Sequence, residues 1–175
     1  MHTWEYEGRT ITFSWLGDVD IEPMRAYALA FTEDGQMLLV GDGQGEFEYW
    51  LPGGGIEAGE TPEEALRREL MEEAAATIQA HKRIGIQRGH DPLMGTEHQV
   101  FYWCRISLAS EFVPETEVTE RRLVSPSEFL DRLFWGRKDP KAKMLLQQAI
   151  ELDQQYEKQN HNAVDSNSGA FNGSA

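Results

Sequence analysis

The sequence has little of several features that define other classes of protein. Its 175 residues include a single cysteine, Cys104, so a disulfide framework within the chain and a cysteine-rich zinc site are both excluded. Basic residues are also scarce, with 16 Lys and Arg against 30 Asp and Glu and a formal net charge of −14. This balance argues against a broad nucleic-acid surface and against binding to an anionic membrane. It does not exclude a small anionic ligand that is held through a divalent cation.

Segments that carry a chain to or across a membrane are missing as well. No apolar run approaches the roughly 20 residues that span a bilayer. Residues 1–5 have neither the basic region nor the apolar region of a secretory signal. The lone cysteine fits a reducing compartment. We therefore expect a cytoplasmic protein that does not associate with membranes.

The apolar residues that are present, 40% of the chain, suffice for one hydrophobic core. We expect a single domain over residues 1–158. Residues 159–175 consist largely of Asn, Ser and Gly and cannot bury enough surface to offset their ordering entropy, so they are predicted to be a disordered tail.

Strand and helix patterns alternate along the rest of the chain. Strands are predicted at 9–16, 25–31, 36–41, 77–88, 97–108 and 121–124, and helices at 61–75, 126–135 and from 140 onward. Residues 97–108 are apolar on both faces, which is typical of a central strand. Residues 52–55, Pro-Gly-Gly-Gly, are a strong breaker. A mixed sheet flanked by helices predicts an α/β or α+β sandwich.

The predicted helix after Thr61 carries an unusual acidic face. At about 100° per residue, Glu69, Glu72 and Glu73 fall at i, i+3 and i+4 and share one side of the helix. Neighbouring carboxylates repel by roughly 1 kcal/mol per pair in water at about 4 Å. Such a cluster is stable when it is solvated, protonated or bound to a cation, and all-oxygen ligation suits Mg²⁺ or Mn²⁺. A solvated face is the ordinary interpretation, but the glycine-rich turn before the helix lets backbone approach a ligand and favours a site.

At these residues the sequence resembles the Nudix (MutT-like) hydrolases. Their signature sets a glycine, a glutamate, an Arg-Glu pair and a Glu-Glu pair at fixed spacing. The residues that match it are Gly54, Glu60, Arg68, Glu69, Leu70, Glu72 and Glu73. Two positions after the acids depart from it, because Ala75 stands where glycine is usual and Ala76 where a larger aliphatic residue is usual.

The resemblance implies a Nudix-type α/β/α sandwich with a mixed β-sheet. It implies hydrolysis of a pyrophosphate bond in a nucleoside diphosphate linked to another group, with Mg²⁺ or Mn²⁺ as cofactor. The substrate is then a small nucleotide, either a nucleoside triphosphate or a nucleotide-sugar such as ADP-ribose, and a homodimer is a further expectation. The alternative is a non-catalytic Nudix-like module that senses a nucleotide.

The resemblance also assigns residue roles. Glu69, Glu72 and Glu73 are implied as metal ligands, with the carbonyl of Gly54 as a further ligand. Glu69 and Glu72 are the catalytic candidates together with Arg68, which orients a glutamate, and the identity of the general base is left open.

A later acidic loop supplies one more candidate ligand in many members of this family. Glu117 is ranked first for that role, with Glu120 and Glu115 as alternatives, and a solvated acidic loop is an equally good interpretation.

Substrate contacts are assigned from residue chemistry. Arg25 suits a phosphate contact, and Trp50 and Tyr102 suit stacking on a base. Phe101 and Trp103 are aromatic too, but a place in the core is the better interpretation for both.

Overall fold

The structure is a computed structural model that describes residues 1–42, 49–114 and 117–168, without the side chains of residues 162–168. In chain order its elements are β1 (His2–Tyr6), β2 (Arg9–Gly17), β3 (Arg25–Phe31), β4 (Met37–Gly41), β5 (Tyr49–Trp50), β6 (Gly53–Gly55), α1 (Pro62–Ala74), β7 (Ala76–Asp91), β8 (Gly95–Leu108), β9 (Glu120–Val124), α2 (Pro126–Arg132) and α3 (Pro140–Ser168). Each predicted strand and helix corresponds to one of these elements, whereas β1, β5 and β6 go beyond the sequence predictions.

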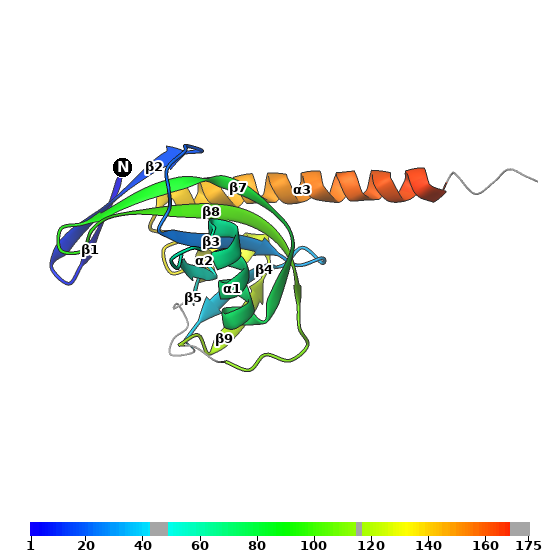
Figure 1. Cartoon of the computed structure of the whole chain (residues 1–175), viewed down its shortest axis with the longest axis horizontal. Helices are drawn as coiled ribbons and strands as arrows, with labels where there is room; N and C mark the ends of the chain where they lie inside the picture. Colours follow the sequence, from blue (N-terminus) through cyan, green and yellow to red (C-terminus); the bar gives the residue numbers. More distant parts are fainter. Residues whose placement is uncertain (43–48, 115–116, 169–175) are drawn as a thin grey trace, which may run out of the picture.

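One mixed sheet forms the middle of the protein (Figure 1). Within the described residues it has nine strands, in the order β1-β2-β7-β8-β3-β4-β5, with β6 paired to β3 and β9 to β4. Strand β3 runs parallel to β8, and the other pairs are antiparallel. Strand β8 lies between β7 and β3, which confirms its predicted central position.

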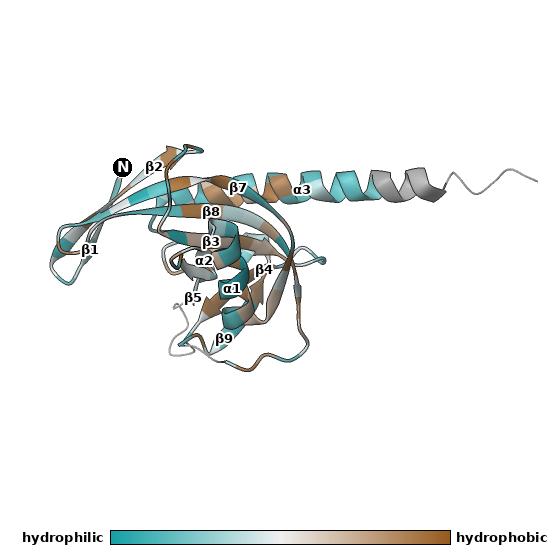
Figure 2. Cartoon of the chain, in the orientation of Figure 1, coloured by the Kyte–Doolittle hydropathy of each residue, from teal (hydrophilic) through white to brown (hydrophobic). Residues whose placement is uncertain are grey.

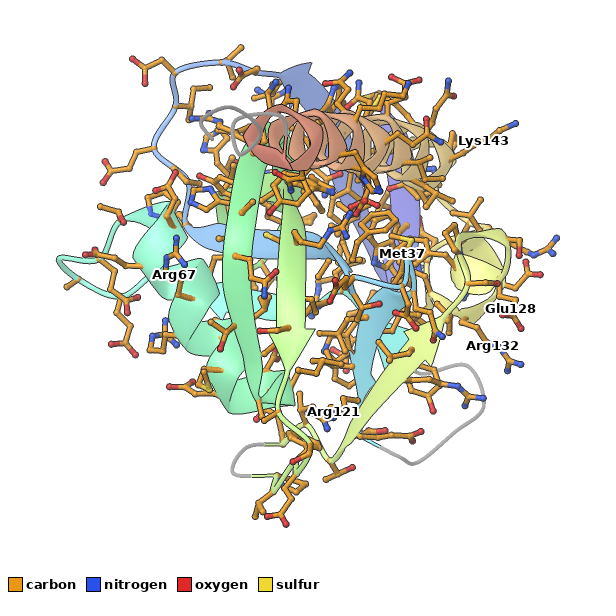
Figure 3. All side chains as sticks on the ribbon, turned by 90° about the vertical axis from the view of Figure 1, so that its right-hand side faces the viewer. Met37, Arg67, Arg121, Glu128, Arg132 and Lys143 are labelled. Atoms are coloured by element: carbon orange, nitrogen blue, oxygen red, sulfur yellow. The ribbon has the colours of Figure 1, made fainter. Side chains whose placement is uncertain are left out.

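The two faces of the sheet bury separate hydrophobic clusters, because successive side chains on a strand point to opposite faces. On one face, Ala26 and Tyr102 pack with Leu70 of α1. On the other face, Phe101 packs in a cluster with Leu145 of α3. Figure 3 shows α1 and α2 on opposite sides of the strands. The predicted α/β/α sandwich is therefore confirmed.

Helix α1 begins as its sequence predicts. The Thr61 hydroxyl accepts a hydrogen bond from the backbone N–H of Glu64, and the Glu64 carboxylate accepts one from the backbone N–H of Thr61. This capping box, with Pro62 at the first helical position, satisfies backbone donors that the first turn leaves unpaired.

The other end of α1 shows the cost of a sequence departure. Ala75 caps the helix in the left-handed conformation, with φ +49° and ψ +42°. Glycine adopts this conformation without a steric penalty, whereas a residue with a Cβ is strained by about 1 kcal/mol or more. The glycine of the Nudix signature is therefore missing where the backbone calls for one.

The breaker predicted at residues 52–55 is wrong for its last three residues, which form β6. Strand β6 pairs with β3, with Tyr27 opposite Gly53 and Ala26 opposite Gly54. A Cβ on Gly53 would lie 2.1 Å from the carbonyl oxygen of Ala26, and its φ of +135° also favours glycine. Gly53 thus lets a short strand fit closely against β3 where a side chain would prevent it.

Helix α3 docks on the sheet through a buried ion pair. The Arg105 guanidinium lies 2.8 Å from the Asp153 carboxylate, which also accepts a hydrogen bond from the Trp103 indole at 3.1 Å. Beyond the sheet the helix projects and becomes mostly hydrophilic (Figure 2). It continues to Ser168, so residues 159–168 are helical where a disordered tail was expected, and residues 169–175 lie outside the described chain. No helix of the described chain is both long and apolar enough to cross a membrane.

We predict that Ala75→Gly stabilises the protein. Relief of the left-handed strain, less the greater entropy that glycine gives the unfolded chain, should raise the free energy of unfolding by up to about 1 kcal/mol. Urea unfolding measures this change. The matched control is Ala58→Gly, at an exposed loop position whose φ is not positive, where the same replacement should destabilise. A lower stability for Ala75→Gly would contradict the strain assignment.

Candidate active site

Arg68 organises the acidic face of α1. Its Nε and Nη2 bind the two carboxylate oxygens of Glu60 at 2.8 and 2.9 Å. Its Nη1 lies 2.9 Å from Glu69 and 3.5 Å from Glu72, and Nη2 also donates to the carbonyl oxygen of Gly55 at 2.9 Å. The bidentate bond to Arg68 is the main reason why the pKa of Glu60 falls to about 2. One guanidinium therefore joins the loop before α1 to two of the predicted catalytic acids.

Gly54 gives the Glu69 carboxylate the room that it occupies. A Cβ at this position would lie 2.5 Å from Oε1 of Glu69, closer than any real Cβ contact. A side chain at residue 54 would therefore displace the Glu69 carboxylate from its present position. The structure therefore brings Gly54 and Glu69 together, as the signature implies.

Glu73 is the most unusual acid in the group. Its side chain is buried, and its Oε2 accepts a hydrogen bond from the backbone N–H of Gly53 at 2.8 Å. Burial raises the pKa of Glu73 to about 8, and the charges of Glu69, Glu117 and Glu72 raise it further against the opposing effect of the Gly53 hydrogen bond. A buried acid surrounded by other acids favours a bound proton or a bound cation.

The later acidic loop approaches this cluster. Glu117 is exposed, and it lies near enough for its charge to raise the pKa of Glu73. Glu120, the first alternative, accepts a hydrogen bond from the Tyr49 hydroxyl at 2.7 Å. Glu115, the second alternative, lies outside the described residues. Of the two described candidates, Glu117 is the one whose charge acts on Glu73.

The acidic side chains of the site offer oxygen donors that suit a divalent cation. Across residues 1–42, 49–114 and 117–168, no three His, Cys, Asp or Glu side chains already stand in a metal-binding arrangement. Glu69 and Glu72 face Arg68 instead. The chemistry nevertheless fits a hard cation, because the donors are carboxylate oxygens. One of them, Glu73, is also buried beside other acids.

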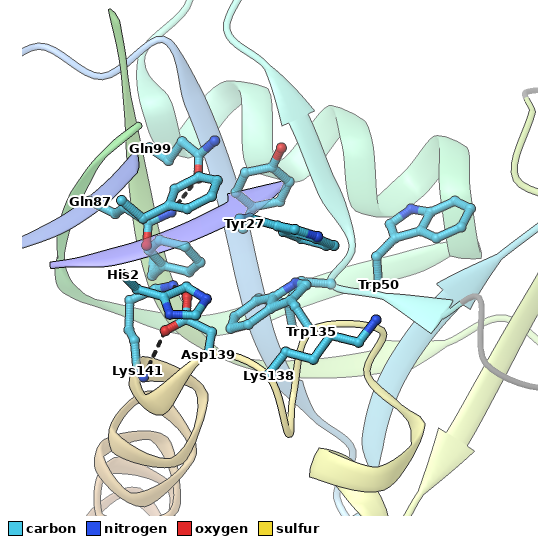
Figure 4. A pocket seen from close by; sticks show the side chains of 13 residues that line it. His2, Tyr27, Trp50, Gln87, Gln99, Trp135, Lys138, Asp139 and Lys141 are labelled. Atoms are coloured by element: carbon cyan, nitrogen blue, oxygen red, sulfur yellow. Dashed lines mark hydrogen bonds and ion pairs between the residues drawn. The ribbon is translucent and has the colours of Figure 1, made fainter. Parts of the chain in front are cut away.

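A cavity of about 250 Å³ opens on the other face of the sheet, beside β6 (Figure 4). Aromatic rings form most of its wall, and polar groups of β7, β8 and the start of α3 complete it. The lining residues are His2, Trp4, Phe13, Tyr27, Trp50, Leu51, Gln87, Gln99, Phe101, Trp135, Lys138, Asp139 and Lys141. Tyr27 is paired with Gly53, whose N–H binds Glu73, so β6 links a strand of the cavity wall to the acidic cluster.

Of the three substrate contacts predicted from the sequence, one lines the cavity and two do not. Trp50 lines the cavity. Arg25 forms an ion pair with Glu97 at 3.1 Å. Tyr102 does not reach the cavity, because it points to the opposite face, is buried beneath α1 and donates its hydroxyl hydrogen to Glu63 at 2.7 Å. Phe101 is buried as predicted, yet it also contributes to the cavity wall.

Several cavity residues were missed by sequence reasoning. Gln87 and Gln99 lie in strands that carry many other polar residues, so no pattern in the sequence singles them out. Trp135 and Lys141 flank the predicted start of the third helix, where no pattern distinguishes a cavity wall from ordinary packing.

Comparison with known proteins gives the family. The model of the NUDIX domain matches residues 22–147, which contain α1 and the whole acidic cluster. No curated protein matches the sequence significantly.

Solved structures share the fold at low sequence identity. A mutant of the pyrophosphohydrolase BsRppH from Bacillus subtilis has a TM-score of 0.67 and 21% identity, with 86% of this chain and 97% of that chain covered. The Nudix domain of Shewanella oneidensis NrtR, complexed with ADP ribose, has a TM-score of 0.56 and 20% identity, with 76% and 89% covered. A Nudix hydrolase from Nitrosomonas europaea has a TM-score of 0.55 and 21% identity, with 75% and 87% covered.

The buried acid predicts a pH-dependent stability for the protein in EDTA. Because the folded state raises the pKa of Glu73 from 4.5 to about 8, its stabilising contribution is complete below pH 4.5 and is lost as the pH rises through 8. Glu73→Gln removes that loss. At pH 8.5 the variant should unfold with a free energy higher by on the order of 3 kcal/mol, and at pH 5 the difference should nearly vanish.

Urea unfolding at the two pH values measures this difference, with the exposed Glu111→Gln as the control that should show no such pH-dependent gain. A variant that gains nothing at pH 8.5 would show that Glu73 is already ionised at little cost.

Proposed function

The chain belongs to the Nudix family, and we propose that it is a pyrophosphohydrolase that uses Mg²⁺ or Mn²⁺ to cleave a pyrophosphate bond in a nucleoside diphosphate joined to another group. That group is further phosphate, as in a nucleoside triphosphate, or a sugar phosphate, as in ADP-ribose. The observation that carries the proposal is Glu73, a buried acid one helical turn after Glu69, on which the charges of Glu69, Glu117 and Glu72 act. Burying that carboxyl among other acids is costly unless a cation uses the charge.

Each acid has a part in this account. Glu69, Glu72 and Glu73 would hold the cation with the carbonyl of Gly54, and Glu117 would add a ligand from the later loop. A bound divalent cation neutralises the diphosphate and lowers the pKa of the attacking water. Glu69 or Glu72 accepts the proton of that water.

Arg68 acts as a positioning residue. Its bonds to Glu60 and Gly55 fix it to the loop, so it can hold Glu69 and Glu72 in place. Side chains that are already held in place before substrate binds lose no further conformational entropy during the reaction.

We assign the base of the nucleotide to the aromatic cavity. Its volume of about 250 Å³ is near the lower end of pockets that hold small ligands. Trp50 lines it, and the residues that follow lead directly into Gly53. A nucleotide whose base enters the cavity therefore extends its phosphates toward β6 and the acids. The NrtR domain complexed with ADP ribose supports a small nucleotide as ligand.

A module that binds a nucleotide without cleaving it is the second candidate. The placement of Glu69 and Glu72 against Arg68, with no metal arrangement preformed in the described part of the chain, is the observation in its favour. Both candidates use the same cavity, and turnover separates them. For either one we propose the cytoplasm as the site of action, because the lone Cys104 suits a reducing compartment.

We predict metal-dependent turnover that depends on the motif acids. Phosphate and pyrophosphate release should be followed over nucleoside triphosphates, nucleotide-sugars, dinucleoside polyphosphates and NADH, with Mg²⁺, with Mn²⁺ and with EDTA. One class should be cleaved, and Glu73→Gln should lower kcat at least ~100-fold because it removes a cation ligand and not core packing.

The exposed Glu111→Gln serves as the control and should keep full activity. Nucleotide binding without turnover would favour the second candidate, and an unchanged kcat in Glu73→Gln would remove Glu73 from the metal site.

A further inference from the structure

One wall of the aromatic cavity holds a buried acceptor that has no partner. Gln87 is 4% exposed and lines the cavity from β7. Its Oε1 is the only buried side-chain acceptor in the described residues without a hydrogen bond. A desolvated amide oxygen is costly to leave unpaired, so it calls for a donor from outside the protein.

The orientation of this amide is fixed by a relay that begins at a charged group. Glu97, held by its ion pair with Arg25, can only accept hydrogen bonds as a carboxylate. Gln99 must therefore turn its NH₂ group toward Glu97, which leaves its Oε1 to accept from Nε2 of Gln87 at 3.0 Å. Gln87 therefore donates from its Nε2, and its Oε1 is the atom left without a partner. Figure 4 shows the bond between Gln87 and Gln99 at one end of the cavity.

Two charged groups of the cavity, Lys141 and Asp139, are paired with each other. The buried Lys141 ammonium lies 2.5 Å from Asp139 and 4.5 Å from the centre of the Trp135 ring. Asp139 also accepts a hydrogen bond from the backbone N–H of Lys141 at 2.9 Å. Unlike these two groups, the buried acceptor of Gln87 can be satisfied by a ligand without breaking a bond within the protein.

We propose that Gln87 is a specificity-determining residue that reads an amino group on the nucleobase, with Gln99 and Glu97 as positioning residues. The inference rests on the proposed function for its ligand class, nucleotides. A base that offers an amine pairs with the oxygen. A base with a carbonyl or a C–H at the same place leaves the oxygen unpaired or faces it with another acceptor, and the protein discriminates against it.

Binding in EDTA tests this without catalysis. Dissociation constants are measured by tryptophan fluorescence for three pairs of nucleoside monophosphates that differ by one amino group. The pairs are adenine and purine, guanine and hypoxanthine, and cytosine and pyrimidin-2-one. For at least one pair, loss of the amine should weaken binding about 10-fold or more in the wild-type protein. In Gln87→Met that ratio should fall below about 2-fold.

Two further variants sharpen the test. Gln79→Met, at an exposed position of β7 outside this cavity, should keep the wild-type ratio. Glu97→Gln, on the partly exposed side of the relay, allows both amides to turn over and should lower the ratio without loss of folding. If Gln87→Met fails to fold, the binding ratio of Glu97→Gln tests the role of Gln87 instead.

The outcomes separate this inference from the proposed function. A wild-type protein that binds none of the six nucleotides, or that binds both members of every pair equally, would overturn the inference whatever the turnover assay shows. The same holds for a ratio that survives in both Gln87→Met and Glu97→Gln. Discrimination in binding without metal-dependent turnover would overturn the proposed function and leave the role of Gln87 intact.

Discussion

The hydrogen bond between the Glu73 carboxylate and the backbone of Gly53 is the interaction on which the site depends. It joins the buried side of α1 to β6, and β6 is in turn paired with β3 in the sheet. Glycine at 53 is needed for this approach, since a Cβ there would collide with the backbone of Ala26, and glycine at 54 leaves room for the Glu69 carboxylate. The same closeness removes Glu73 from water and raises its pKa to about 8. The Glu73 carboxyl group therefore both joins α1 to β6 and has the raised pKa of the site.

Arg68 compensates the charge of some acids at the site, whereas Glu73 has no basic partner among the described residues. Arg68 offsets the acids that face the loop, most strongly Glu60, and gives the cluster a fixed form. In the described structure Arg68 forms no hydrogen bond or ion pair with Glu73, whose charge is left to a proton or a cation. A net charge of −14 would otherwise repel a phosphorylated substrate, so a cation at this point serves both the protein and its ligand.

Local patterns predicted much of the fold and the acidic half of the site. The capping box located α1, and helical spacing placed Glu69, Glu72 and Glu73 together. The cavity could not be predicted in this way, because strand register brings Tyr27, Gln87 and Gln99 together from distant parts of the chain. Tyr102 was misplaced for a related reason. Alternation requires Tyr102 and Trp103 to face opposite ways, but only the packing of α1 decides which of them is covered by that helix.

Strand β6 shows a limit of another kind. Three glycines between helix and strand signals indicate a turn, and the structure pairs them with β3 because no side chain stands in the way. The central claim is that this close pairing buries Glu73, raises its pKa and makes ionisation of its carboxyl at neutral pH favourable only with a bound cation. Carbon-13 NMR titration of the Glu73 carboxyl, in EDTA and with Mg²⁺, tests it most directly. The account predicts a pKa near 8 without metal and a fall of several units with Mg²⁺. A pKa near 4.5 in EDTA, or no change with Mg²⁺, would contradict it.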